Sequence, residues 1–274
     1  MLAKVFSAAV HGLSAIPIEV EVDIASFGVP KLILVGLPDK AVEEATERVR
    51  SAIKNSDAEF PVRRITVNLA PADIPKEGPS YDLPIAIGIL IASGQLYVDV
   101  SKACFMGELS LDGRIRPVTG VLAQTFLAKE QGMTTIFVPK ANAREAALIS
   151  GITIIPVEHL KDVLYHLSGD KIIPPQEITR IETLTTHHFP YDMKDIRGQE
   201  RAKRGLEIAA AGGHNILFKG PPGSGKTLLA RTLPSILPSL TFDEMLDVTK
   251  LYSIAGMLDN DMLITQRPYR SPHH

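Results

Sequence analysis

Length, composition and charge set the first limits on this protein. The chain has 274 residues, of which 45% are hydrophobic and 22% are charged, and its formal net charge is −2. These values suit a soluble globular protein of about two domains, and no bulk basicity indicates nucleic acid as a partner. No apolar run is long enough to span a bilayer, no signal-peptide pattern opens the chain, and Cys104 is the only cysteine in the sequence. We therefore expect a cytoplasmic protein without a membrane segment or an internal disulfide.

The first third of the chain predicts strands around one helix. Hydrophobic residues alternate with acidic ones from Ile18 to Ile24, which predicts a strand with one solvated face. An apolar run at 32–36 predicts a more buried strand, and residues 64–69 alternate again. Between these two strands, apolar residues at helical spacing over 39–53 predict a helix.

Residues 76–168 pass from a loop and a helix to alternating helices and strands. A loop rich in glycine and proline leads into an apolar helix over 85–93, and residues 107–117 predict a hairpin that turns at Asp112-Gly113. Helices and strands then alternate over the segments 121–131, 135–138, 143–149, 152–155 and 157–167. Residues 1–168 are therefore predicted to form one α+β domain.

The order of these segments resembles the proteolytic domain of Lon-type proteases over residues 60–160. The resemblance is carried by Gly78-Pro79-Ser80, by the hairpin region 107–118 and by the strand and turn at 135–142. It implies a fold like domain 2 of ribosomal protein S5, with Ser80 where the family has its nucleophile. A serine needs a base to take its proton, and Leu122 stands where that family has its lysine, while Lys129 lies two turns further on. We therefore interpret Ser80 as a helix N-cap or structural residue and not as a catalytic one.

Residues 169–190 are typical of a linker between two domains. They are polar, with the pair Pro174-Pro175 and several threonines. His187 and His188 are neighbours without a cluster of further metal-ligand residues nearby, so a plain linker is favoured over a metal site. Residues 191–274 are predicted to form the first part of a P-loop α/β domain.

The strongest chemical signal of the chain is the segment Gly220 to Thr227, which fits the phosphate-binding pattern G-x-x-x-x-G-K-[ST]. Residues 215–219 before it predict a short buried strand, and residues 228–233 after it predict a helix. The loop glycines allow successive N–H groups to face an anion, Lys226 supplies an ammonium for the outer phosphates, and Thr227 supplies a hydroxyl for Mg²⁺. ATP and Mg²⁺ are therefore the predicted cofactors, with Thr227 as the metal ligand. The predicted nucleotide-binding residues are Gly220, Pro221, Pro222, Gly223, Ser224, Gly225, Lys226, Thr227 and Leu228.

The segments around this loop carry a second resemblance. A predicted helix over 201–211 precedes the loop, and a capping box at 241–244 opens a helix to Ser253. Together with 210–215 and the tail 266–274, this order resembles the magnesium-chelatase-like AAA+ ATPases of bacteria, the YifB/ComM family. The resemblance implies a ring-forming motor, a homohexamer, that acts on DNA by a branch-migration or helicase-like activity related to competence. It also implies that Ile196 and Gly198 lie against adenine and that the Lon-like domain is a non-proteolytic platform.

Several expectations and alternatives accompany this interpretation. The Walker B acids, sensors and arginine finger of the family are not found in the sequence, so we expect the chain to bind ATP and to turn it over poorly by itself. An ATP-dependent serine protease is one alternative, against which Leu122 argues. A metal-insertion subunit like magnesium chelatase is another, although no metal-ligand cluster is visible. The basic residues Arg201, Lys203 and Arg204 fit DNA or a solvated helix face equally well.

Overall fold

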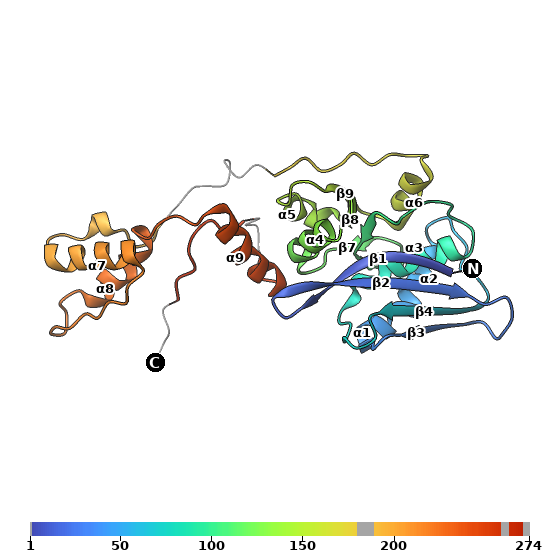
Figure 1. Cartoon of the computed structure of the whole chain (residues 1–274), viewed down its shortest axis with the longest axis horizontal. Coiled ribbons are helices and arrows are strands. Elements are labelled where there is room, and N and C mark those ends of the chain that lie inside the picture. The colour runs from blue at the N-terminus through green and yellow to red at the C-terminus, as the bar shows by residue number, and fades with distance from the viewer. Residues whose placement is uncertain (1, 180–188, 259–262, 271–274) are drawn as a thin grey trace. The chain divides into compact units, whose positions relative to one another are not determined.

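The protein is described by a computed structural model that covers residues 2–179, 189–258 and 263–270 (Figure 1). The chain divides into two compact units, the first made of Met1–Thr179 with Lys250–Met262 and the second of Arg180–Thr249 with Leu263–His274. No helix of the described residues is both long enough and apolar enough to cross a membrane.

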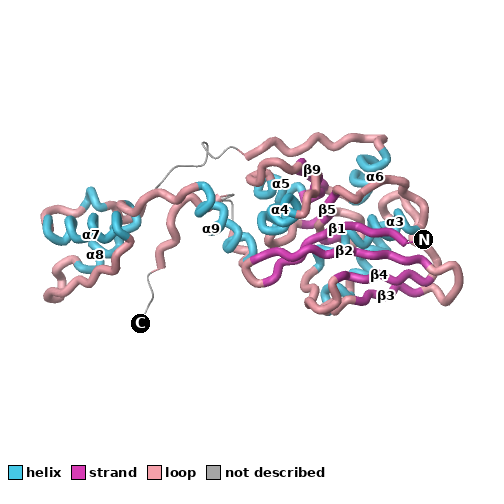
Figure 2. The backbone as a smooth tube through the Cα atoms, in the orientation of Figure 1, coloured by secondary structure: helices cyan, strands magenta, loops and turns pink. Residues whose placement is uncertain are grey.

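A seven-stranded sheet runs through the first unit. Its strands are β1 (Leu2–His11), β2 (Ser14–Ile24), β3 (Lys31–Val35), β4 (Arg64–Ala70), β5 (Ala103–Phe105), β8 (Thr135–Pro139) and β9 (Thr153–Val157). They lie in the order β3-β4-β2-β1-β5-β8-β9, and Figures 1 and 2 together label all seven strands. The β1–β2 and β2–β4 pairings are antiparallel and the other four are parallel, so the sheet is mixed and mostly parallel. The mixture of helices and strands predicted for this region is confirmed.

The helices of the first unit cover this sheet or follow its strands. They are α1 (Lys40–Glu43), α2 (Ala45–Lys54), α3 (Asp82–Ala92), α4 (Val121–Glu130), α5 (Ala143–Ala146) and α6 (Leu160–Ser168). Helix α3 is apolar on nearly every side and almost wholly buried. It packs so closely on β2 that a Cβ placed at Gly88 would lie 2.6 Å from Cγ2 of Val22. Glycine at this position is therefore what allows the helix to approach the sheet.

Hydrophobic and acidic residues alternate along β2, which gives the strand one buried face and one solvated face. Ile18, Val20 and Val22 are fully buried, whereas Glu19 and Glu21 face away from the core and pair with the ammonium of Lys4 on β1. The short strands β6 (Glu108–Leu109) and β7 (Ile115–Arg116) form the predicted hairpin.

Several boundaries differ from the sequence predictions. The helix predicted over 39–53 is divided into α1 and α2, and the helix predicted from 157 begins at Leu160 because β9 extends to Val157. Strand β5 was not predicted, because a run of three buried residues does not show the alternation of buried and exposed side chains that identifies a strand. Its place between β1 and β8 comes from pairing with strands that are remote in the sequence.

The second unit is built from helices in the residues that the structure describes. Helix α7 (Glu200–Gly212) and helix α8 (Lys226–Thr232) flank the phosphate-binding loop. Helix α9 (Phe242–Ile254) follows; it begins in the second unit, and its last residues, from Lys250, belong to the first. The buried strand predicted over 215–219 is wrong, because these residues form no ladder and Leu217 is 90% exposed. A strand needs the backbone of a neighbour to pair with, and every described strand belongs to the first unit.

Candidate functional site: a phosphate-binding loop and a separate pocket

The predicted phosphate-binding loop runs directly into α8, which begins at Lys226. Gly223 and Gly225 have positive φ angles of 76° and 82°, and a Cβ at either position would meet open space. Backbone conformation, not crowding, therefore requires glycine at both positions. Gly225 is the left-handed N-cap of α8. The amide groups of the first helical turn have no partner within the helix, so they are free to face a ligand.

The Lys226 side chain folds back over this loop. Its Nζ donates to the carbonyl oxygens of Gly220 at 2.9 Å and Pro221 at 2.7 Å, and it lies 3.4 Å from Oγ of Ser224. The Ser224 hydroxyl donates to the Pro221 oxygen at 2.9 Å. The ammonium is thus held at the loop by neutral acceptors, which a phosphate can replace with stronger, charge-assisted bonds. The next two predicted residues, Thr227 and Leu228, are exposed.

One apolar cluster connects the remaining predicted residues to this helix. Ile196 is 9% exposed and belongs to a cluster with Leu206 of α7 and Leu229 of α8. Gly198, with a φ of 66°, stands just before α7. Ile196 therefore belongs to the apolar cluster that packs α7 and α8. The contact of Ile196 and Gly198 with adenine stays a prediction.

Two tyrosines from outside the phosphate-binding loop form hydrogen bonds with residues of α8. An N–H of Arg231 donates to the hydroxyl of Tyr191 at 3.2 Å, and the guanidinium carbon lies 5.4 Å from the centre of that ring. The hydroxyl of Tyr269 donates to the carbonyl oxygen of Ala230 at 3.1 Å. These partners are about 40 residues apart along the chain, so no local pattern could have revealed them.

Arg267, in the tail after α9, binds the capping box of that helix. Its Nε donates to the carbonyl oxygen of Pro238 at 2.8 Å, and one terminal nitrogen lies 3.2 and 3.0 Å from the two carboxylate oxygens of Glu244. Glu244 also accepts from the backbone N–H of Thr241, as the capping box requires. The pKa of Glu244 is lowered by this backbone bond and by Arg267. The tail is therefore anchored to the second unit by a charged side chain.

Ser80 lies in the first unit, in a pocket of about 590 Å³. It sits in the middle of a 3-10 turn over Pro79–Tyr81, and the residue that caps α3 is Tyr81. The interpretation of Ser80 as a helix N-cap is therefore wrong, because the extra 3-10 turn moves the start of the helix beyond it. Leu122, at the position of the Lon-type lysine, is fully buried, and Lys129 is exposed in the last turn of α4.

The buried Lys76 is the nearest lysine to Ser80 in the sequence. Its ammonium donates to the carbonyl oxygen of Pro71, and burial lowers its pKa. It is not among the residues that line the Ser80 pocket. The described residues therefore show no lysine directed at the Ser80 hydroxyl from this loop.

The sequence was compared with protein families and with curated proteins. Residues 20–142 match the family model for subunit ChlI of Mg-chelatase, and residues 192–274 match the one for magnesium chelatase, subunit ChlI. The whole chain is 44% identical to YifB of Escherichia coli and 44% identical to the competence protein ComM of Haemophilus influenzae, of which it covers 53% and 54%. The chain thus spans about half the length of these curated relatives.

A more distant similarity concerns the first unit. Half of the chain, 149 residues, is 30% identical to Lon protease 1 of Myxococcus xanthus and covers 18% of it. This agrees with the mixed α/β sheet and confirms the Lon-like character predicted for the region. Because the two chelatase matches and the relatives at 44% identity over the full chain agree, this chain belongs to the magnesium-chelatase-like family that includes YifB and ComM.

Proposed function

We propose that the chain binds ATP with Mg²⁺ through the loop Gly220–Thr227. The observation that carries the proposal is the Lys226 ammonium held over a loop with left-handed glycines at 223 and 225. Lys226 would contact the outer phosphates, the loop N–H groups would face them, and the exposed Thr227 hydroxyl would bind the magnesium ion. Membership of a chelatase-like AAA+ family supports the same assignment.

Calorimetry of the chain with MgATP tests this proposal. Lys226→Ala should weaken binding by about 1–3 kcal/mol, the range for losing a charge-assisted contact. Lys219→Ala is the matched control, since it removes an exposed lysine just before the loop and should leave the affinity nearly unchanged. Equal affinities for the parent and Lys226→Ala would contradict the proposal.

We further propose that the whole protein is a ring-forming, hexameric and cytoplasmic ATPase that moves DNA, with the first unit as a non-proteolytic platform. The support comes from the family and from the relative ComM, which is named as a competence protein. Two of the three basic residues of α7 add little, because Lys203 pairs with Glu200 and Arg204 pairs with Glu207.

Fluorescence anisotropy of labelled DNA, with and without ATP, tests the DNA-binding part. Binding should weaken steeply as salt rises, because phosphate contacts release counterions. An affinity for DNA that does not change with salt concentration would contradict the proposal that the protein acts on DNA. The absence of binding at low salt with ATP present would contradict it as well.

A further inference from the structure

Two neighbouring segments at one end of the seven-stranded sheet expose apolar and basic side chains together. Residues 25–31 connect β2 to β3, and residues 60–64 lead into β4. The backbone N–H of Ala25 donates to the carbonyl oxygen of Arg64 at 3.0 Å, and Lys31 is paired with Arg64 in the register of β3 and β4. The two segments therefore lie side by side, and we call them the apolar–basic tip.

Three large apolar side chains of this tip project into solvent. Phe27 is 92% exposed, and Val29 and Val62 are each 82% exposed. Gly28 has a φ of 127°, and a Cβ placed there would lie 3.6 Å from Cβ of Arg64, so the loop packs on β4 while its apolar side chains stay outside. Figure 2 shows this loop extending beyond the ends of β3 and β4. A group of exposed apolar side chains at one place indicates a surface that a partner or a membrane covers.

Tyr97 extends the same surface on the side of α3. A hollow of about 400 Å³ beside the tip is lined by Ser26, Pro61 and Arg63 of the tip and by Gly94, which follows α3. The Tyr97 hydroxyl would lie 3.1 Å from a Cβ placed at Gly94, and Tyr97 is largely exposed. Tyrosine is a residue that is enriched where a membrane meets water, because its ring is apolar and its hydroxyl is polar.

The basic residues of the tip are available for an anionic partner. Lys31, Arg63 and Arg64 are exposed, and within the described part of the chain none of them forms an ion pair. The two segments contain no acidic residue, and the acids that border them are Asp23 and Glu59. Three cations therefore stand against two carboxylates, which leaves an excess of positive charge beside the apolar side chains.

We infer that the first unit attaches peripherally to an anionic lipid surface through the apolar–basic tip. Phe27, Val29 and Val62 enter the boundary between headgroups and acyl chains, and the cations stay at the level of the lipid phosphates. Side chains that protrude from loops enter a lipid leaflet without needing a complementary shape, whereas a protein partner must supply a matching groove. Nucleic acid would pair with the cations but would leave the two valines without an apolar environment.

Fluorescence of a single introduced indole tests the insertion. The chain contains no tryptophan, so Phe27→Trp provides a reporter at the tip of the full chain. With vesicles of phosphatidylcholine and about one third phosphatidylglycerol, its emission should shift to the blue, and lipid brominated on the acyl chains should quench it. Leu13→Trp is the matched control and should show neither effect, because the exposed Leu13 lies in the turn between β1 and β2, at the other end of β2.

Sedimentation of the full chain with vesicles measures the affinity. The parent should bind the anionic vesicles at least about tenfold more tightly than vesicles of phosphatidylcholine alone, and Arg63→Gln combined with Arg64→Gln should reduce this preference. Phe27→Ala should weaken binding to the anionic vesicles by about tenfold. Lys40→Gln removes an exposed lysine at the start of α1, outside the tip, and should change nothing. Lys226→Ala should bind vesicles as the parent does, so failure of the nucleotide proposal would not affect this one.

Several results would overturn the inference. One is an emission of Phe27→Trp that anionic vesicles leave unchanged, or that changes as much for Leu13→Trp. Another is a Phe27→Ala variant that binds vesicles as tightly as the parent, since attraction would then rest on charge alone. Self-association without vesicles that is lost in Phe27→Ala would assign the tip to a second copy of the chain. DNA binding that is lost with Arg63 and Arg64, without any vesicle binding by the parent, would assign it to nucleic acid.

Discussion

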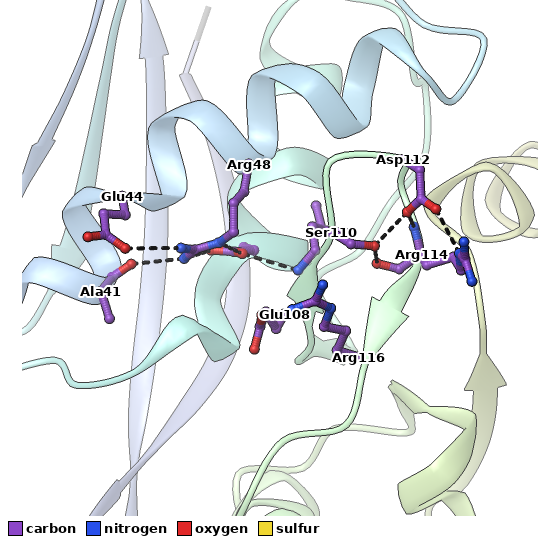
Figure 3. A network of polar contacts seen from close by, with 10 residues as sticks. Ala41, Glu44, Arg48, Glu108, Ser110, Asp112, Arg114 and Arg116 are labelled. Carbon is purple, nitrogen blue, oxygen red and sulfur yellow. Dashed lines mark hydrogen bonds and ion pairs between the residues drawn. The ribbon is translucent and has the colours of Figure 1, made fainter.

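Arg48 and Asp82 form a two-bonded ion pair that joins α2 to the start of α3. Nε of Arg48 donates to Oδ2 of Asp82 at 2.7 Å, and a terminal nitrogen donates to Oδ1 at 3.0 Å. Figure 3 shows Arg48 reaching from its helix towards Ala41, to whose carbonyl oxygen it donates at 2.8 Å, and towards Glu44, with which it forms an ion pair at 3.9 Å. Asp82 is fully buried and accepts a third bond from the backbone N–H of Leu109. The pair thus fixes the helix that follows Ser80 against the hairpin.

The first prediction concerns the pH dependence of this pair. Burial raises the pKa of Asp82 from 3.8 to about 6, because lost hydration outweighs the bonds from Arg48 and Leu109. The folded state therefore binds this proton more tightly than the unfolded state does. The contribution of Asp82 to the free energy of unfolding falls as the pH rises from about 4 to about 6, by up to roughly 3 kcal/mol.

Urea unfolding of the parent and of Asp82→Asn, followed by circular dichroism, measures this contribution. The parent's stability minus that of the variant should be smaller at pH 7 than at pH 4. The subtraction removes the titration of all other groups that the substitution leaves alone. A difference that is constant with pH, or that grows towards pH 7, would show that the pKa of this carboxyl is not raised.

A second prediction compares two glycines of the second unit under the same substitution. Gly205 lies inside α7, where an added Cβ would meet Ile216 at an ordinary 3.6 Å. Gly205→Ala should therefore stabilise the unit by about 0.5–1 kcal/mol. Gly225→Ala should strain the left-handed loop by roughly 1–2 kcal/mol and weaken MgATP binding. Thermal unfolding measures the stability of both variants, and calorimetry measures their affinity for MgATP. Equal effects of the two substitutions would show that the positive φ of Gly225 does not make glycine necessary there.

Ser80 provides a third prediction, on proteolysis. Its hydroxyl has no lysine or histidine among the described residues of its pocket, and Leu122 occupies the position of the expected base. A fluorophosphonate probe should label the parent no more than it labels Ser80→Ala, because an unassisted hydroxyl is a weak nucleophile. Stoichiometric labelling of Ser80, or casein cleavage that is lost in Ser80→Ala, would support the protease alternative instead.

The fourth prediction concerns the anchored tail of the second unit. Arg267→Ala removes the bonds to Pro238 and Glu244, so the segment around Tyr269 should detach more often. Chymotrypsin should then cleave after Tyr269 faster than in the parent. Arg201→Ala, an exposed arginine of α7, is the control and should leave the rate unchanged. An equal rate for Arg267→Ala would mean that the tail is held without this side chain.

Local patterns in the sequence were enough to predict many helices, strands and turns of this protein and its phosphate-binding loop. The alternation along 18–24, the turn at Asp112-Gly113 and the helix after the phosphate-binding loop all follow from neighbouring residues, since strand and helix periods are properties of short segments. The loop Gly220–Thr227 was readable for the same reason, because its glycines, lysine and threonine are consecutive in the chain.

Tertiary structure alone decided features that depend on remote partners. Residues 215–219 have the composition of a strand yet form none, because pairing requires a neighbouring backbone. Ser80 is a residue type that often caps helices, yet it lies in a 3-10 turn. Helix α3 starts two residues later, at the buried Asp82, which forms an ion pair with Arg48. Glu77 and Gln124 are 47 positions apart by number, and only the folding of the hairpin region and α4 against the loop places both at one pocket. Sequence periodicity carries no information about such distant contacts, which chain reversal and packing establish.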